Sequence, residues 1–339
     1  MKKTLIAAAL TALAAAGQAN AAFVAQPILV DPDGAGGGSG AIQITSLNWL
    51  AGNTLTVGAL GLQGEAASNL ADPAGRTLTT WYQAALNTFV YNSGGGSTST
   101  LPVAGSEWTV VARIEEQAIN IGTANAAFLP LGGSVSVYYH AAANANDITG
   151  VGYNDGLEIL RGTIVAGSGS FLDLTRLIGS PLVPLDGFVN NDAPGVGTHV
   201  GSGQTNIQVD IGATAGDFIN SNFFLTDITS LNFLLSAIQD VDDNGQLVAP
   251  FTQANPSNQV GGVAPSYSPG NGAFPNGING ADCPTDGQGN FTQRCDFHFQ
   301  TTNVTSFTYQ QQVPTPGTLA LAGLGLSLLG MAGRRRKQL

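Results

Sequence analysis

An acidic stretch late in the chain has the residue types and spacing of a calcium-binding loop. Asp240, Asp242 and Asn244 alternate along the chain, and Gly245 follows them. Oxygen ligands at alternate positions can converge on Ca2+, and glycine permits the sharp turn that such a loop needs. The second half of the pattern fails, because Phe251 stands where the bidentate glutamate is required. Two interpretations stay open: a weak calcium site and, more simply, a solvated acidic turn between strands.

The sequence patterns of the common hydrolases are missing. His140, His199 and His298 are far apart and stand in no H-E-x-x-H pattern, which would indicate a zinc protease. The serines at 167–170 lack the G-x-S-x-G frame of a nucleophile elbow. A glycosidase needs only two carboxylates at the proper separation, and no motif locates such a pair. We therefore expect no enzyme and, apart from the weak calcium hypothesis, no cofactor.

The two cysteines predict a disulfide. Cys283 and Cys295 enclose 11 residues, and the flanking stretch at 250–296 is rich in proline and glycine. In an oxidising compartment such a pair is expected to be oxidised. Closing a loop of this size would stabilise the fold by about 3 kcal/mol on the entropy model. We expect a long surface loop tied by this bond.

The charge balance of the central part of the chain excludes one class of partner. Between the two ends there are five arginines, no lysine and all 22 acidic residues, a formal net charge of −17. Such a surface repels the phosphate backbone, so nucleic acid is not expected as a partner. An acidic surface would remain soluble outside the cell and could attract divalent cations.

The N-terminus has the layout of a secretory signal peptide. Lys2 and Lys3 precede an apolar stretch at 5–16, and small residues at 19–21 form a cleavage site. Residues 1–21 are therefore predicted to direct export through the Sec machinery. The mature chain is expected to begin at Ala22.

The C-terminus ends in an apolar segment with a basic cluster behind it. The apolar run at 318–333 is shorter than the roughly 20 residues that span a bilayer comfortably. Arg334, Arg335 and Arg336 fit the positive-inside rule and would hold the tail end in the cytoplasm. An ordinary single-span anchor is the alternative to a temporary membrane segment.

The tail at 313–339 resembles a PEP-CTERM sorting signal. Pro314, Thr315 and Pro316 lead into a Leu/Gly-rich run and the terminal arginine cluster, with Thr315 in the usual place of a glutamate. The resemblance implies an exosortase as partner, transient insertion in the inner membrane of a Gram-negative bacterium, and delivery to the cell surface or matrix.

The part of the chain between the signals, 22–312, is predicted to be all-β and sandwich-like, with short strands and Gly/Asn/Pro-rich loops. The clearest strand runs over 108–115, where apolar residues alternate with polar ones. We expect a strand pair over 78–91 and a helical turn or strand over 231–238. Further strands are expected at 41–44, 55–57, 134–139, 157–165, 207–211, 222–226 and 297–309.

The segment at 137–162 resembles the flocculation-associated PEP-CTERM proteins. A strand, a polar loop, a Gly-Tyr-Asn-Asp-Gly turn and a second strand follow one another there. The resemblance implies a surface protein that promotes aggregation or biofilm formation by associating with exopolysaccharide or neighbouring cells. The alternative is a secreted carbohydrate-binding module or polysaccharide-active hydrolase. Trp49, Trp81 and Trp108 are its candidate sugar platforms, although Trp108 fits better as core.

Overall fold

The structure is a computed structural model. It describes residues 26–36, 40–60, 77–93, 96–119, 125–179, 181–189, 191–237, 247–267, 278–279 and 295–308. Contacts within the chain divide it into two units, Met1–Thr308 and Tyr309–Leu339, and all the described residues lie in the first unit.

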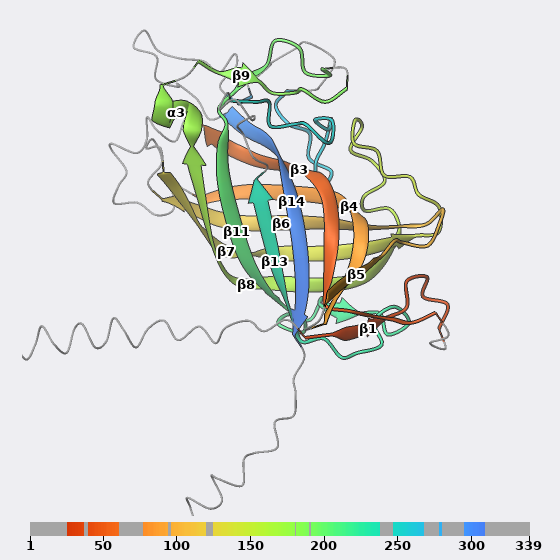
Figure 1. Ribbon diagram of the computed structural model, residues 1–339. Helices are drawn as coiled ribbons and strands as arrows, with labels where there is room; N and C mark the ends of the chain where they lie inside the picture. Colours follow the sequence, from red (N-terminus) through yellow and green to blue (C-terminus); the bar gives the residue numbers. More distant parts are fainter. Residues whose placement is uncertain are drawn as a thin grey trace, which may run out of the picture. The chain divides into compact units, whose positions relative to one another are not determined.

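Eight long strands form one closed, antiparallel barrel. Each strand pairs with the next one in the chain, and the last returns to the first, so the wall runs up and down in sequence order (Figure 1). The pairing of β8 with β11 closes the sheet. The strands are β3 (Ser46–Leu60), β4 (Thr77–Ser93), β6 (Glu107–Ile119), β7 (Asn125–His140), β8 (Leu157–Asp173), β11 (Gly201–Asp210), β13 (Ser230–Ala237) and β14 (Cys295–Thr308).

Shorter elements lie around the barrel. Figure 1 shows α3 and β9 beyond one end of the barrel and β1 near the other. Strand β5 extends the sheet beside β4, and β12 pairs with β8. The shorter elements are β1 (Ile28–Val30), β2 (Ile42–Ile44), β5 (Gly96–Thr100), α3 (Leu174–Ile178), β9 (Val183–Pro184), β10 (Gly197–Thr198) and β12 (Phe218–Ile219).

The all-β prediction is confirmed, and the main sheet is a closed barrel. It closes on itself instead of forming two facing layers, and its strands are longer than expected. Closure removes the unpaired edges that an open sheet leaves exposed. The added length comes from Gly/Ser-rich stretches, such as 166–170, that lie beyond the predicted strands but pair with the neighbouring strands of the barrel wall.

The alternation over 108–115 is confirmed in β6. Trp108, Val110, Ala112 and Ile114 are all buried, and the residues between them face the other side of the sheet. These four side chains belong to the core inside the barrel. An eight-stranded barrel has an interior that side chains can fill.

Three other strand expectations need correction or sharpening. The expected pair over 78–91 is the single strand β4. The segment 231–238, where a helical turn was the alternative, lies mainly in β13. The strand expected over 222–226 is wrong. The backbone N–H groups of Phe223 and Phe224 both donate to the carbonyl of Asn220 at 3.0 Å, which makes a tight turn.

That turn places aromatic rings at one end of the barrel. Trp108 contacts Phe89, Phe223 and Phe224 edge to face, with centroids 5.2 to 5.8 Å apart. Its indole N–H donates to the carbonyl of Pro32 at 2.9 Å, so the N-terminal loop is bonded to the same cluster. The burial of these rings closes this end of the core.

The segment 247–267 covers part of the barrel's outer surface. Its backbone N–H groups bond to three amide side chains from different strands, Asn53, Gln83 and Gln300, at 2.7 to 3.2 Å. This agrees with the surface loop predicted within 250–296. The loop buries these amides and supplies their hydrogen-bond partners, so amide side chains can occupy the outer face of β3 and β4 without contact with water.

Several predictions fall on residues outside the described ranges. These are the signal peptide at 1–21, the tail at 313–339 with its apolar run at 318–333, and the sorting residues Pro314, Thr315, Pro316, Arg334, Arg335 and Arg336. Within the described ranges, no helix has the length and apolar character to span a membrane.

Candidate functional site

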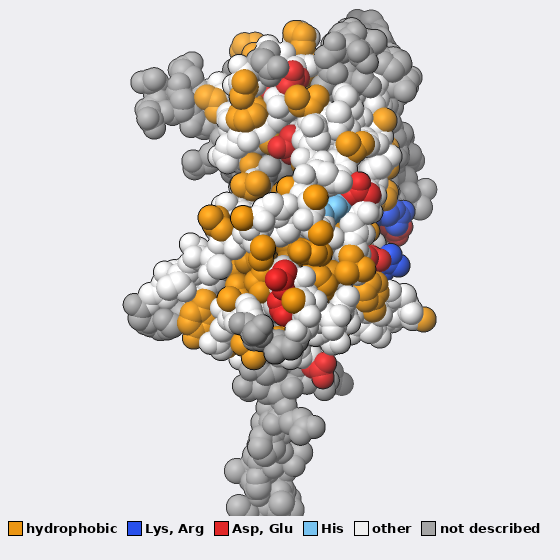
Figure 2. Space-filling model, turned by 90° about the vertical axis from the view of Figure 1, so that its right-hand side faces the viewer, with side chains coloured by type: hydrophobic (Ala, Val, Ile, Leu, Met, Phe, Trp, Pro, Cys, Tyr) orange, Lys and Arg blue, Asp and Glu red, His pale blue; other side chains and the backbone are white. Residues whose placement is uncertain are grey.

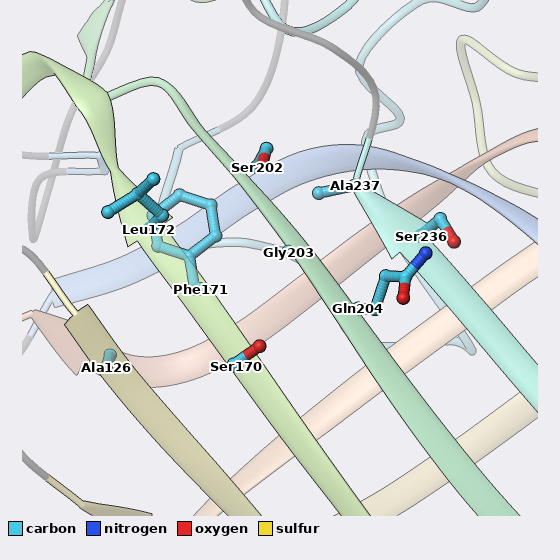
Figure 3. Close-up of a pocket in the computed structure, with 9 residues that line it drawn as sticks. All are labelled: Ala126, Ser170, Phe171, Leu172, Ser202, Gly203, Gln204, Ser236 and Ala237. Atoms are coloured by element: carbon cyan, nitrogen blue, oxygen red, sulfur yellow. The ribbon is translucent and has the colours of Figure 1, made fainter.

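A pocket of about 430 Å3 lies at one rim of the barrel. It is formed where four strands begin or end: the start of β7 and β11 and the end of β8 and β13 (Figure 3). Its lining residues are Ala126, Ser170, Phe171, Leu172, Ser202, Gly203, Gln204, Ser236 and Ala237.

Two glycine-serine stretches shape this rim. Residues 167–170 of β8 pair antiparallel with 204–207 of β11, and Phe171 lies opposite Gly203. A Cβ on Gly201 would stand 2.3 Å from the Phe171 ring, and one on Gly203 would stand 3.2 Å from it. The ring therefore lies against backbone where only glycine leaves room for it.

The pocket is lined by an aromatic ring and by neutral hydrogen-bonding groups. Strand alternation places the side chains of Ser170, Gln204 and Ser236 on one face of the barrel wall and Phe171, which lies opposite Gly203, on the other face, where its ring centroid is 6.0 Å from that of Phe297. None of the described lining residues is ionisable. A ring that packs on C–H groups, with hydroxyl and amide partners around it, suits an uncharged polyhydroxylated ligand.

The surface around the barrel carries little positive charge. Figure 2 shows acidic side chains scattered among hydrophobic and uncharged ones, with the basic side chains at one edge of that face. This agrees with a composition of 22 acidic against 11 basic residues over the whole chain. An anionic ligand would be repelled by this surface, whereas a neutral one would not.

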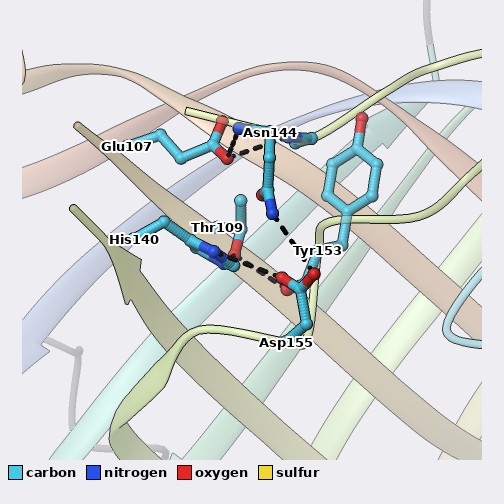
Figure 4. Close-up of polar contacts among 7 residues, drawn as sticks. Glu107, Thr109, His140, Asn144, Tyr153 and Asp155 are labelled. Atoms are coloured by element: carbon cyan, nitrogen blue, oxygen red, sulfur yellow. Dashed lines mark hydrogen bonds and ion pairs between the residues drawn. The ribbon is translucent and has the colours of Figure 1, made fainter. Parts of the chain in front are cut away.

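A second polar cluster lies on the β6–β7 side, under the loop that joins β7 to β8. Glu107 accepts backbone N–H bonds from Asn144 at 2.6 Å and Ala145 at 2.8 Å, which fixes the start of the loop. The Asn144 amide donates to Asp155 at 3.2 Å, and the Asp155 carboxylate faces the His140 Nδ1 at 3.2 Å (Figure 4).

Thr109, His140 and Asp155 follow one another in space as the nucleophile, the base and the orienting carboxylate do in a catalytic triad. The Thr109 Oγ1 lies 3.4 Å from His140 Nε2, and His140 is held by Asp155. However, the Thr109 hydroxyl donates to the carbonyl of Tyr153 at 2.7 Å, and Thr109 is 0% exposed. A nucleophile must reach its substrate, and this hydroxyl is covered. The cluster instead fixes the β7–β8 loop to the barrel.

Buried titratable groups outside the pocket have shifted pKa values. Burial raises the pKa of Glu116 on β6 to about 7, although the Thr80 hydroxyl donates to its carboxyl group. Burial lowers the pKa of His298 on β14 to about 3. The neutral His298 donates from Nε2 to the Asn53 Oδ1 at 3.1 Å. Glu116 is therefore mostly uncharged below about pH 7, and His298 is mostly uncharged above about pH 3.

The three tryptophans expected as sugar platforms have different environments. Trp49 and Trp108 are buried inside the barrel, and Trp49 donates to the Thr305 hydroxyl at 2.9 Å. The expectation that Trp108 is a core residue is confirmed. Trp81 is half-buried on the outer face, where the Arg113 guanidinium lies 5.8 Å from its ring centroid. The rim pocket uses Phe171 instead.

The predicted metal and disulfide residues are mostly outside the described ranges. Asp240, Asp242 and Asn244 all lie there, and the segment 231–238 that precedes them, predicted as a helical turn or strand, lies mainly in β13. In the part of the chain that the structure describes, no three His, Cys, Asp or Glu residues gather as a metal cluster. Cys283 is also outside, while Cys295 is buried at the start of β14, so the disulfide stays a prediction.

Residues 312–337 match the family model for the PEP-CTERM protein-sorting motif. The chain therefore carries a PEP-CTERM sorting signal at its C-terminal end, and this signal implies processing by an exosortase and export to the cell surface or extracellular space. Comparisons with curated proteins and with solved structures found no significant match.

Sequence reasoning missed the rim pocket, although a signal was present. The stretch Gly-Ser-Gly-Ser-Phe at 167–171 and the stretch Gly-Ser-Gly-Gln at 201–204 are similar in composition. Two such stretches in one chain suggest facing strand ends with little side-chain bulk. Their pairing as neighbouring strands of the barrel wall could not be inferred from either stretch alone.

Proposed function

We propose that the protein is a non-enzymatic surface protein that associates with exopolysaccharide and thereby promotes aggregation, flocculation or biofilm formation. The observation that carries the proposal is the neutral rim pocket, whose lining includes Phe171, three serines and a glutamine. The sorting motif supports it, since it delivers the protein to the compartment in which exopolysaccharide accumulates.

The chemistry of the pocket favours binding over catalysis. Glycoside hydrolysis uses a pair of carboxyl groups on either side of the scissile bond. The described lining of the pocket contains no carboxyl group. A neutral polysaccharide chain that crosses the rim could pack a sugar face on Phe171 on one side of the wall and bond its hydroxyls to Ser202, Gln204 and Ser236 on the other. Export by the Sec machinery from a Gram-negative cytoplasm is part of the same proposal.

A glycan array and a reducing-sugar assay with the purified exported protein test the binding claim. We expect binding to neutral glycans and no release of reducing ends. Release of reducing ends that Phe171→Ala abolishes would favour the polysaccharide-active hydrolase instead. Absence of binding to any neutral glycan would contradict the proposal.

The cellular role is tested by deleting the gene and restoring it as wild type or as Phe171→Ala. We expect reduced aggregation and biofilm in the deletion strain, recovery with the wild type, and no recovery with the variant. Phe218→Ala is the matched control, because Phe218 is a partly exposed aromatic on β12, outside the pocket. Unchanged aggregation in the deletion strain would contradict the role.

A further inference from the structure

We infer that the mouth of the barrel, on the inner side of the wall at the rim, binds a small uncharged apolar molecule against Phe171, Phe297 and Phe299. The inference goes beyond the proposed function, which concerns a polysaccharide that crosses the rim. It shares only Phe171 with that proposal and does not depend on it.

The three rings lie inside the barrel. The ring centroids of Phe171 and Phe297 are 6.0 Å apart, although their strands, β8 and β14, are separated in the wall by β11 and β13. Neighbouring strands lie about 4.8 Å apart, so two rings on the outer face with two strands between them could not come this close. The contact therefore crosses the interior. Phe299 lies on the same face of β14, with its ring centroid 5.3 Å from that of Phe297.

The rings at the rim are partly exposed, whereas rings deeper in the barrel are not. Phe171, Phe297 and Phe299 are all half-buried. Tyr82 and Phe233 contact each other across the interior, with centroids 5.7 Å apart, and both are 0% exposed. Because the wall is closed, solvent reaches the inner rings at the rim through the mouth of the barrel.

The opposite end of the barrel buries its aromatic rings completely. Trp108 pairs with Tyr139 at the end of β7 that lies away from the rim. The rings of Phe89, Phe223 and Phe224 pack around Trp108 there, and all four side chains are at most 3% exposed. A cluster that only closes the core would bury its rings in the same way. The half-buried rings at the rim therefore fit a binding surface better.

Small residues on the inner face leave room beside the rings. Ala126 of β7 and Gly203 of β11 lie directly opposite Phe171 on the two neighbouring strands. Ala237 of β13 continues the inner face on which Phe233 is buried. Together with Phe171, these three small residues line the pocket of about 430 Å3, so the cavity reaches the inner side of the wall (Figure 3). An eight-stranded barrel has room for one small ligand in this position.

The polar groups near the mouth are paired, which leaves an apolar surface for the ligand. Asp173, at the end of β8, holds His199, whose Nδ1 lies 3.0 Å from its carboxylate. Deeper in the barrel, the Glu116 carboxyl group accepts a hydrogen bond from Thr80, and the Thr80 hydroxyl lies 2.8 Å from that of Thr56. The rings remain to make contact, and burying apolar area against them favours an uncharged ligand.

A fluorescent probe tests the site on the full chain. N-phenylnaphthylamine is uncharged and apolar, and its emission rises when it leaves water. We expect saturable binding that decanol or naphthalene displaces. Displacement by decanol alone would assign the site to a hydrocarbon chain, and displacement by naphthalene alone would assign it to an aromatic ring. A wild-type protein that shows no saturable emission would overturn the inference.

Variants of the barrel locate the probe. Phe299→Ala removes one ring, and Ala237→Trp fills the space beside the rings, so each should weaken probe binding at least tenfold. Phe218→Ala is the matched control, because it removes a partly exposed ring that lies beside Arg161, away from the mouth. Thermal unfolding checks that each variant is folded at the assay temperature.

The apolar run at 318–333 is common to all these proteins, so a difference between them reports on the barrel. Probe affinity that Phe299→Ala and Ala237→Trp both leave unchanged would overturn the inference, whatever the glycan measurements show. Equal losses in these two variants and in Phe218→Ala would also contradict a site at the mouth.

Discussion

Glu116 shows how one side chain makes the stability of this barrel depend on pH. Its pKa is raised from 4.5 to about 7 by burial, so the folded state keeps a proton that the unfolded chain loses. Stability should therefore fall as pH rises from 4.5 to about 7, and the full cost is present above that range. The cost is about 3 kcal/mol, from the size of the shift.

Glu116→Gln should remove this cost. Gln keeps an acceptor for the Thr80 hydroxyl but cannot ionise. Thermal unfolding should give a higher Tm for the variant above pH 7, and the difference should vanish below pH 4.5. Glu115→Gln is the control, because Glu115 is on the exposed face of the same strand and should show no such trend. A lower Tm for Glu116→Gln above pH 7 would contradict the account.

His298 should have the opposite effect at acid pH, where the stability of the protein should increase as the pH rises. Its pKa is lowered from 6.5 to about 3, so the unfolded chain takes up a proton that the folded chain refuses. Stability from this group is complete above pH 6.5 and is lost as pH falls towards 3. An NMR titration of the imidazole protons should show no transition of His298 between these values while the protein stays folded. A transition near 6.5 in the folded protein would show that the side chain is solvated.

At the scale of elements, periodicity predicted the strands with strong apolar alternation. It failed where backbone hydrogen bonds or glycine-rich pairing determine the structure. The 108–115 strand was clear because Trp108, Val110, Ala112 and Ile114 recur at every second position and share one buried face. The 222–226 segment contains two phenylalanines, which favour strands. However, the backbone N–H groups of both phenylalanines donate to the Asn220 carbonyl, so this segment forms a turn. Closure of the barrel depends on β8 and β11, whose Gly/Ser stretches carry almost no apolar signal.

The candidate site was even less predictable at this scale. Phe171 and Gln204 are 33 positions apart in the sequence, and neither belongs to a motif with a known spacing. They share a pocket only because two strand ends meet at the barrel rim. The His140–Asp155 contact is hidden in the same way, since the turn between them determines it.

Adjacent glycines in β7 offer a test of the barrel wall. Gly133 has φ of 124°, and a Cβ there would stand 1.9 Å from the Arg113 carbonyl oxygen, whereas one on Gly132 would meet only Glu115 Oε2 at 4.0 Å. Gly133→Ala should lower the free energy of unfolding by roughly 2 to 4 kcal/mol, because strain adds to the close contact. Denaturant unfolding measures it. Gly132→Ala should change it much less, and equal effects would contradict the register of β6 and β7.

At the scale of the whole molecule, the sorting motif and the exported barrel predict defined mature ends. Mass spectrometry of the protein from cells should find an N-terminus at Ala22 and a C-terminus near 312–316. Replacing Arg334, Arg335 and Arg336 with alanine should leave the tail uncut, since these residues hold the segment in place for processing. Normal cleavage of the triple variant would contradict that role for the cluster.

The central claim is that a neutral pocket on an exported barrel binds neutral polysaccharide. The most direct measurement is the Kd of the purified exported protein for neutral exopolysaccharide at low and high ionic strength, in wild type, Phe171→Ala and Phe218→Ala. The account predicts an affinity that salt barely changes, at least tenfold weaker in Phe171→Ala and unchanged in Phe218→Ala. Binding that salt abolishes, or that Phe171→Ala leaves intact, would contradict it.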